Sequence, residues 1–259
     1  VTGHHGVVGQ LKVSDDAAKL ELLAKHPDED FTCLEAISDS MVLIGSATGK
    51  VYSYDGATIT ELASLSEFNE PVLDIAHDGN NIWVVGARGL IAHSTDGKKF
   101  DTVEVKDISQ PLATFPDVKP ADYYMGVSNI SADTVQFNAT VNGKPAVADT
   151  DYTLYPDEGF VQVANQLDAN PAPTITFKFN PGPPFRIGDV SWNVVLVANG
   201  KVTIGGEFGM VLQSEDGGAS WVRRDTRIVP HEPEPAYWLG GTTNGDQIWL
   251  VGAAGISEV

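Results

Sequence analysis

Side chains that commonly carry catalysis are present in this chain, but none stands in a pattern that defines an active site. His4 and His5 are adjacent, and adjacent side chains on a strand point to opposite sides, so the pair does not form a metal site by itself. Asp149 and Asp151 match the first positions of a calcium-binding loop, but the required glycine and terminal glutamate do not follow. The sequence contains no motif for a nucleophilic serine, a phosphate-binding loop or a zinc protease. We therefore predict no catalytic residue, no cofactor and no metal.

The composition excludes several classes of partner. The 259 residues include 35 Asp and Glu against 16 Lys and Arg, which gives a formal net charge of −19. Such a charge repels phosphate backbones and anionic lipids, so we expect neither nucleic-acid binding nor membrane insertion. No apolar run reaches the ~20 residues of a membrane span, and no secretory signal is visible in the first ten residues. We expect the single cysteine, Cys33, to be buried and the acidic stretch 28–30 to be a solvated loop.

The sequence repeats one set of glycine, serine and aspartate positions. Three copies have these residues at offsets 0, 3, 8 and 10: Gly86, Gly89, Ser94 and Asp96; Gly206, Gly209, Ser214 and Asp216; Gly6, Gly9, Ser14 and Asp16. A looser copy contains Gly45 and Gly49, and a shortened copy contains Gly252 and Gly255. The second glycines at positions 9, 49 and 89 are 40 residues apart. We predict that the glycine pairs form the tight turns of repeated structural units.

A period near 40 residues is typical of the four-stranded blade of a β-propeller. Around Gly86 we expect strands over 73–76, 82–85, 90–93 and 102–105. The predicted fold is all-β, a propeller of about five blades in which stacking buries the faces of each sheet. Only residues 14–24 have the composition of a helix. We expect strands 7–13 and 20–23 to close the ring by sharing one blade with strands 237–242 and 247–251.

One segment of the repeat matches a known motif. Residues 214–221, Ser-Glu-Asp-Gly-Gly-Ala-Ser-Trp, fit the Asp-box Ser-x-Asp-x-Gly-x-Thr/Ser-Trp at every position, and residues 94–100 fit it with one residue fewer. The chain therefore resembles Asp-box propellers, a group that includes sialidases and photosystem II assembly propellers, over roughly residues 1–106 and 185–259. The resemblance implies a hairpin turn in which the Asp caps backbone N–H groups and the aromatic packs between blades. It assigns a structural role to Ser94, Asp96, Phe100, Ser214, Asp216, Gly218 and Trp221.

The resemblance to sialidases does not extend to their active site. Sialidases need three arginines around the substrate carboxylate, and this chain has five arginines in all: Arg88, Arg186, Arg223, Arg224 and Arg227. The tetrapeptide Phe185-Arg186-Ile187-Gly188 is similar to the sialidase Phe-Arg-Ile-Pro, but it lacks the proline and lies late in the chain. These departures argue against sialidase activity. We expect a protein that is not an enzyme.

The repeat is interrupted between residues 107 and 184. Two eroded blades would fit the length, but residues 135–141 alternate, Asn142-Gly143 suits a type I′ turn, and strands are predicted at 160–163 and 174–179. The segment is similar to a small immunoglobulin-like β-sandwich module that recurs in tailed-phage structural proteins. Pro-rich stretches at 116–120 and 181–184 suit linkers on either side. We predict propeller blades at 1–106 and 185–259, with an inserted β-sandwich at 107–184.

These observations favour a structural or binding scaffold. Trp192 and Trp238 do not fall on repeated positions, so they are candidate contacts for a partner. The phage-like module suggests a virion component of the tail or capsid surface, with other structural proteins in a symmetric assembly, or a host-surface glycan, as partners. The alternative locations are extracytoplasmic or another soluble compartment. The alternative functions are an assembly factor resembling the photosystem II propellers, with Arg88 and the cluster Arg223, Arg224 and Arg227 as its positive patch, or a sialidase-like protein.

Overall fold

The computed structural model describes residues 1–14, 17–26, 28–105, 108–114, 118–125, 130–179, 190–224, 237–245, 247–253 and 255–258. In these ranges the chain forms β-strands and four short 3-10 turns, without an α-helix. No helix of the described chain is long and apolar enough to cross a membrane. The fold is therefore all-β, as the strand-rich composition predicts.

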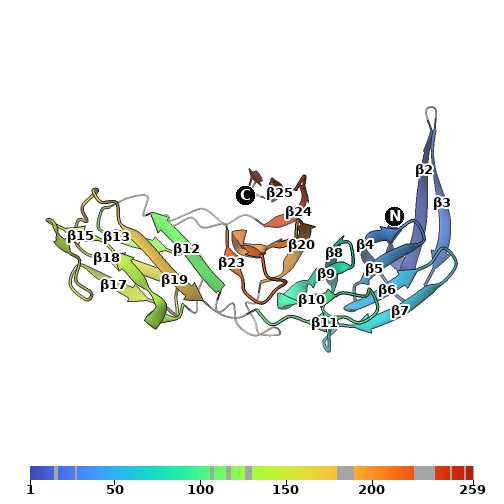
Figure 1. Cartoon of the computed structure of the whole chain (residues 1–259), viewed down its shortest axis with the longest axis horizontal. Coiled ribbons are helices and arrows are strands. Elements are labelled where there is room, and N and C mark those ends of the chain that lie inside the picture. Colours follow the sequence, from blue (N-terminus) through green and yellow to red (C-terminus); the bar gives the residue numbers. More distant parts are fainter. Residues whose placement is uncertain are drawn as a thin grey trace.

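Outside residues 108–179, the described strands form five antiparallel groups, which we name sheets A to E (Figure 1). Sheet A contains β1 (Thr2–Gly3), β2 (Val7–Ser14) and β3 (Ala17–Lys25). Sheet B contains β4 (Phe31–Ser38), β5 (Met41–Ser46), β6 (Lys50–Tyr54) and β7 (Ile59–Ser64), and sheet C contains β8 (Val72–Asp78), β9 (Asn81–Gly86), β10 (Ile91–Ser94) and β11 (Asp101–Thr102). Sheet D contains β20 (Trp192–Ala198), β21 (Lys201–Gly206), β22 (Val211–Ser214) and β23 (Val222–Arg223), and sheet E contains β24 (Trp238–Thr243), β25 (Ile248–Gly252) and β26 (Gly255–Glu258). Sheets B and C each have four antiparallel strands in chain order, which is the strand arrangement of a propeller blade, and the four strands of sheet D have the same arrangement within a larger sheet of seven strands.

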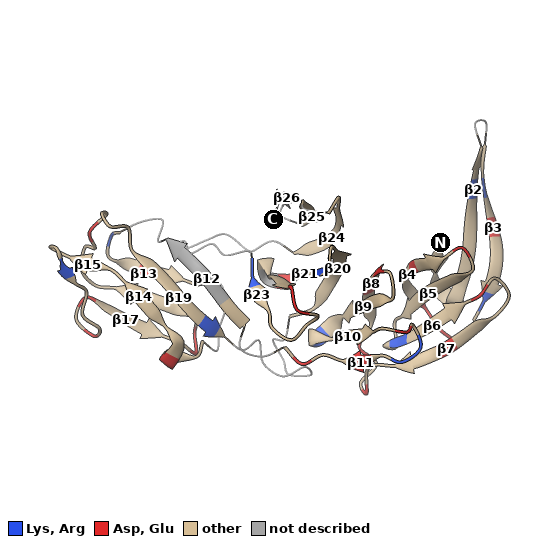
Figure 2. Cartoon of the chain, viewed as in Figure 1, with Lys and Arg blue, Asp and Glu red and all other residues tan. Residues whose placement is uncertain are grey.

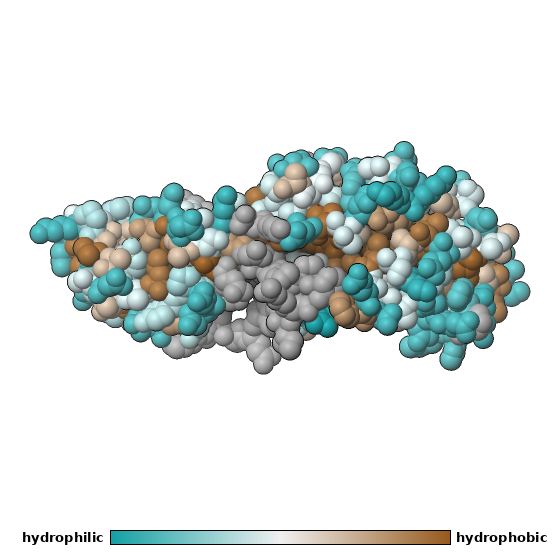
Figure 3. Space-filling model, turned by 90° about the horizontal axis from the view of Figure 1, so that it is seen from below, coloured by the Kyte–Doolittle hydropathy of each residue, from teal (hydrophilic) through white to brown (hydrophobic). Residues whose placement is uncertain are grey.

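The first strands of sheets B to E pack against one another, β4 on β8, β8 on β20 and β20 on β24. Alternation along each strand supplies an apolar face to both neighbours. On β9, Ile82 and Val84 join the cluster shared with sheet B, whereas Trp83 and Val85 join the cluster shared with sheet D. Apolar side chains consequently gather along the middle of the molecule, with hydrophilic residues at its rims (Figure 3).

The predicted glycine turns connect the second and third strands. Gly86 and Gly206 are extended and precede the 3-10 turns Ala87–Gly89 and Glu207–Gly209, whose last glycines have φ of +80° and +66°. A Cβ atom on Gly86 would overlap the carbonyl oxygen of Pro71, because the chain returns here to the start of its own sheet. In four sheets, the backbone N–H of the residue after the second strand donates to the carbonyl oxygen of the residue before the first strand, at 2.8 to 3.1 Å. The pairs are Ala47 to Asp30, Ala87 to Pro71, Glu207 to Ser191 and Ala253 to Tyr237.

Sheet A differs from the sequence interpretation in two respects. Its turn spans His4–Gly6 and is preceded by Gly3, so the glycine pair is Gly3 and Gly6, and Gly9 lies inside β2. The segment considered as a helix forms β3 instead, because Ala18, Leu20 and Leu22 alternate with charged residues and pair with β2.

The terminal strands do not share a sheet in the described chain. β1, β2 and β3 form sheet A, whereas β24, β25 and β26 form sheet E. Ring closure through one shared blade is therefore not seen. The reason is that β26 pairs along β25 and occupies the position at which β2 was expected to pair.

Residues 108–179 form a β-sandwich. Its strands are β12 (Ile108–Thr114), β13 (Ala121–Tyr124), β14 (Gln136–Asn138), β15 (Thr140–Val141), β16 (Lys144–Pro145), β17 (Tyr152–Tyr155), β18 (Phe160–Val163) and β19 (Thr174–Phe179). One layer of the sandwich contains β14, β19 and β12, and the other layer contains β13, β18 and β17. β12 also pairs with β23 through Ser109 and Val222, so the sandwich continues sheet D. One apolar cluster spans the sandwich and sheets C and D, and most of the predicted Pro-rich linkers lie outside the described residues.

Candidate functional site

The turn between β22 and β23 contains the residues of the predicted Asp-box. The Asp216 carboxylate accepts bonds from the Ser220 N–H at 2.9 Å and the Ser220 hydroxyl at 2.6 Å, and the Ser214 hydroxyl donates to it at 2.8 Å. These bonds lower the pKa of Asp216 to about 2. The Gly218 N–H donates to the Ser214 hydroxyl at 2.8 Å. The turn is therefore held by its own side chains, and Ser214 and Asp216 serve its structure.

The shorter turn between β10 and β11 uses the same design. Lys98 and Lys99 donate their backbone N–H groups to Asp96 at 2.8 and 2.9 Å, and the Gly97 N–H donates to the Ser94 hydroxyl at 3.0 Å. Phe100 packs against the cluster between sheets B and C. Both turns position an aromatic side chain between neighbouring sheets, which is a structural role.

The two tryptophans proposed as partner contacts are buried instead. Trp192 is 2% exposed in the cluster shared by sheets C and D and the sandwich, and Trp238 is 4% exposed between sheets D and E. Each is the first residue of the first strand of its sheet, a position that Phe31 and Val72 occupy in sheets B and C. Trp192 and Trp238 thus fill one repeated position between sheets. Each lies 14 residues before the turn glycine of its sheet, as Val72 does before Gly86, so this repeat was visible in the sequence.

One carboxylate, Glu29, and one thiol, Cys33, also lie in environments that differ from the predicted ones. Glu29, expected in a solvated loop, is 7% exposed and accepts bonds from the hydroxyls of Tyr52 at 2.9 Å and Thr48 at 2.8 Å. Cys33 is half-buried beside the cluster between sheets B and C, and burial raises the pKa of its thiol to about 12. Neither group is poised for chemistry, because the first is already paired and the second stays protonated.

Within the described residues, a hollow between sheets D and E is a candidate binding site. The hollow depends on one repeated position, which lies three residues before the last residue of the second strand of a sheet. Leu43 occupies this position in sheet B, and Trp83 occupies it in sheet C. In sheet D this position holds Thr203, which is too small to fill the space. The resulting pocket has a volume of about 340 Å³. Sequence reasoning missed it, although the loss of a large apolar residue at a repeated position is a visible signal.

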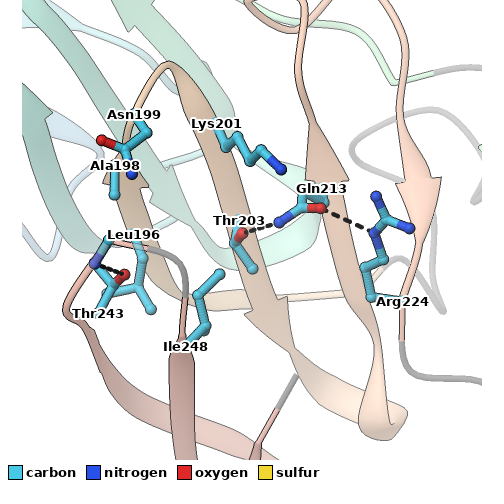
Figure 4. A pocket seen from close by; sticks show the side chains of 10 residues that line it. Leu196, Ala198, Asn199, Lys201, Thr203, Gln213, Arg224, Thr243 and Ile248 are labelled. Atoms are coloured by element: carbon cyan, nitrogen blue, oxygen red, sulfur yellow. Dashed lines mark hydrogen bonds between the residues drawn. The ribbon is translucent and has the colours of Figure 1, made fainter.

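The pocket has one polar and one apolar side (Figure 4). Its lining comprises Leu196, Ala198, Asn199, Lys201, Thr203, Gln213, Arg224, Thr243, Gly245 and Ile248. Gln213 donates to the Thr203 hydroxyl at 3.1 Å and accepts from the Arg224 Nε–H at 2.9 Å. This chain of bonds fixes the Arg224 guanidinium at the pocket and directs its terminal nitrogens away from Gln213.

One carboxylate lies beside the two cations of the pocket. Glu215 Oε1 is 2.9 Å from Lys201 Nζ and 3.8 Å from an Arg224 terminal nitrogen. The Lys201 ammonium, followed by the Arg224 charge, lowers the pKa of Glu215. Two positive charges thus face one negative charge in a chain of net charge −19; Lys201 begins β21 and Arg224 follows the last residue of β23. Figure 2 shows where basic and acidic residues lie along the chain. The arrangement can hold a further anionic group by charge-assisted hydrogen bonds.

The other predicted arginines do not join this site. Arg88 lies 3.6 Å from the buried Glu70 carboxylate, and Arg223 is buried and donates to the Met125 carbonyl at 2.8 Å. Arg186 and Arg227 fall outside the described residues. The described part of the chain holds no group of three or more His, Cys, Asp or Glu that is arranged to bind a metal.

Comparison with known proteins returns β-propellers at low similarity. No family model and no curated protein matches the chain. Among solved structures, the chain is similar to the Myceliophteria thermophila Cps50 (Swd1) β-propeller domain, with 11% identity, a TM-score of 0.48 and coverage of 100% of this chain and 64% of that one. It is also similar to the C-terminal WD40 domain of Sif2 (12% identity, TM-score 0.43, 96% of this chain and 61% of that one) and to YCF48 bound to D1 peptide (15%, 0.33, 99% and 86%). The chain thus spans less than two thirds of the first of these structures.

Proposed function

We propose that this chain is a non-enzymatic binding scaffold that holds an anionic group of a partner protein between sheets D and E. The observation that carries the proposal is the pocket around Thr203, in which Gln213 orients Arg224 and Lys201 lies close by. Carboxylates are the anionic groups that a protein partner supplies most readily, and the planar guanidinium binds them through two parallel bonds.

The sandwich supports a scaffold role because it is held in a fixed position. β12 pairs with β23, and Arg223 of that strand donates to Met125 of the sandwich. A common apolar cluster joins the sandwich to sheets C and D. Two modules that share a sheet and a core present their surfaces in a constant relative orientation, which suits a protein that brings partners together.

The location of the scaffold in a virion is a narrower proposal. It rests on the similarity of segment 107–184 to modules of phage structural proteins. Electron microscopy of particles that lack this protein tests it, because a tail or capsid-surface component should alter morphology or adsorption when it is removed. Normal particles with normal adsorption would contradict this location. The alternative, an assembly factor resembling the photosystem II propellers, draws its support from Arg224, the clustered arginine that lines a pocket.

Titration with a short acidic peptide tests the pocket. We expect a labelled peptide of alternating Asp and Ser to bind the full chain, and its Asn counterpart to bind much more weakly. Arg224→Gln should weaken binding about tenfold, the effect of losing one charged hydrogen bond. Glu215→Gln should strengthen it, because the competing carboxylate is removed. Lys19→Gln on β3 removes one positive charge far from the pocket and should leave binding unchanged. Equal binding to Arg224→Gln and wild type would contradict the proposal.

The non-enzymatic part of the proposal has a separate test. A fluorogenic sialoside should not be hydrolysed by the chain above the rate in buffer. Turnover that disappears in Arg186→Ala would overturn this part, since Arg186 is the residue of the sialidase-like tetrapeptide. Loss of peptide binding and presence of turnover are independent readouts, so each part can fail alone.

A further inference from the structure

A row of aromatic side chains crosses the outward face of the sandwich sheet β13, β18 and β17. Tyr123 and Val161 of the paired strands are fully buried, so the next residues along, Tyr124 and Phe160, point to the opposite face. Tyr155 of β17 pairs with Phe160 and completes the row. The ring centres of Tyr155 and Phe160 are 4.4 Å apart with an interplanar angle of 13°, and those of Tyr124 and Phe160 are 5.5 Å apart.

The end of this row is accessible. The side chain of Tyr124 is 45% exposed, and β13 is the edge strand of its sheet in the described chain. The Tyr124 and Phe160 rings are tilted by 40° to each other, and in the described chain β18 is the one strand of this sheet that pairs with β13. Large aromatic residues on the outward face of a sheet add nothing to the core. Their presence in a row therefore indicates a contact surface.

Carboxylates surround the aromatic row. Asp122 lies on the same face as Tyr124, two residues earlier, beside Gln162, which donates to it at 3.2 Å. The exposed residues Asp157 and Glu158 form the turn that joins Tyr155 to Phe160. Segment 108–179 contains eight Asp and Glu against three Lys, and it contains no arginine. The potential around the row is thus negative, and it adds to the negative potential on the faces of the rings.

We propose that this face docks a basic segment of a partner protein, with an Arg or Lys side chain stacked on Tyr124 and paired with Asp122. Charge complementarity selects this occupant, because ring faces and carboxylates both attract a cation. A neutral sugar would gain from the ring but not from the surrounding negative charge, and an acidic ligand would be repelled. The site lies on the sandwich and does not depend on the pocket between sheets D and E. Its failure would leave the proposed function of that pocket intact.

The test uses the full chain and a labelled peptide of alternating Arg and Ser, with binding measured by fluorescence anisotropy. Tyr124→Leu keeps an apolar side chain but removes the ring, so binding should weaken about threefold to tenfold if the cation stacks on it. Asp122→Asn should weaken binding about threefold, whereas Glu67→Gln, which removes an exposed charge between sheets B and C, should not. Phe68→Leu, at a side chain 64% exposed, is the matched control for loss of an aromatic ring.

Three outcomes decide the proposal. Selective weakening by Tyr124→Leu and Asp122→Asn, with both variants melting at the wild-type temperature, supports it. Equal weakening by Glu67→Gln would show general attraction to an acidic chain and would overturn it. Binding of a neutral hexasaccharide of N-acetylglucosamine that requires Tyr124, with no Tyr124 dependence of the peptide, would also overturn it and assign the row to a glycan.

Discussion

Sheet D has two junctions with its neighbours, and they differ in how the same backbone space is filled. On the side of sheet C, the Trp221 ring from the β22–β23 turn meets Trp83 edge to face, with ring centres 6.0 Å apart. Gly218 of that turn lies directly against the Trp83 ring, where a Cβ atom would clash. On the side of sheet E, Thr203 stands at the position equivalent to Trp83, and a pocket of about 340 Å³ opens. The junction with the small residue therefore contains a pocket, and the junction with the tryptophan is packed.

At each junction of sheet D, one hydrogen bond between a side chain and a backbone group crosses between the sheets. At the junction of sheets C and D, the Val195 N–H donates to the Asp74 carboxylate at 2.9 Å. At the junction of sheets D and E, the Asn193 amide donates to the Trp238 carbonyl at 2.8 Å. Each bond joins the first strands of neighbouring sheets. The insertion of the sandwich between β11 and β20 does not disturb the stacking of β8 on β20. Side chains, not backbone geometry, thus separate the packed junction from the open one.

The largest effect is expected from opening the packed junction. Trp221→Ala should lower the free energy of unfolding by about 3–5 kcal/mol, because a fully buried tryptophan leaves a cavity that rigid neighbours cannot fill. Urea denaturation measures the loss. Trp249→Ala is the control. Trp249 of sheet E occupies the position that Trp83 has in sheet C, but its side chain is only half-buried, so its loss should lower the free energy of unfolding less. Equal losses would show that the two tryptophans are packed alike and would remove the contrast.

A pH dependence distinguishes the bond at the packed junction. Burial, with a smaller contribution from Glu35, raises the pKa of Asp74 from 3.8 to about 6, against the lowering effect of the Val195 and Ile75 N–H groups. The folded chain therefore holds this proton more tightly than the unfolded chain, and stability falls as the pH rises from about 4 to about 6. The corresponding change is about 1–3 kcal/mol.

Asp74→Asn isolates this contribution. Asp74 accepts the Val195 and Ile75 N–H groups on its two oxygens, and the single asparagine oxygen keeps one of these bonds, so the variant should be less stable than wild type at pH 4. Because its side chain does not ionise, its stability relative to wild type should rise between pH 4 and pH 7. Urea denaturation at these two values measures the difference. Asp78→Asn, at an exposed residue of the same strand, should leave the wild-type profile unchanged. Parallel profiles for Asp74→Asn and wild type would show that Asp74 ionises normally in the folded chain.

Filling the open junction should abolish its binding without a large cost in stability. Thr203→Leu places there the residue that sheet B has at the equivalent position, Leu43. The larger side chain occupies the pocket and removes the hydroxyl that accepts from Gln213. We expect affinity for the acidic peptide to fall about tenfold, while unfolding free energy changes by less than about 1.5 kcal/mol. Thr243→Ser keeps a small polar lining residue and serves as control. Unchanged affinity in Thr203→Leu would separate the peptide site from the pocket.

The sequence was informative where a physical constraint repeats. Gly86 and Gly206 were predictable because the returning chain excludes a Cβ atom, and Asp216 was predictable because a tight turn needs an acceptor for its N–H groups. The prediction that Gly6 and Gly9 form the turn pair of sheet A is wrong. Gly3, Gly6 and Gly9 are each three residues apart, so both Gly3 with Gly6 and Gly6 with Gly9 have the spacing of a turn pair, and the structure uses the first. The interpretation of Trp192 and Trp238 as candidate partner contacts is wrong, because both occupy the buried first position of a first strand, 14 residues before the turn glycine of the sheet. Thr203 at a repeated apolar position was a visible signal for the pocket, but Lys201 and Arg224 come to the same Glu215 only after β21, β22 and β23 are placed in one sheet.

The smallest effect is expected at the turns that position the aromatic side chains of the two junctions of sheet C. Bonds from Ser220 and Ser214 lower the pKa of Asp216 to about 2, and bonds from the Lys98 and Lys99 N–H groups lower the pKa of Asp96. A depressed folded-state pKa contributes stability that is complete above about pH 4 and is lost as the pH falls toward 2. Asp216→Asn should therefore lower the melting temperature at pH 7 and match wild type at pH 2. Asp96→Asn should show the same trend with a smaller amplitude, because Asp96 lacks the bond that the Ser220 hydroxyl gives to Asp216. A larger effect at Asp96 would mean that the turn beside Phe100, not the turn beside Trp221, is the more tightly held.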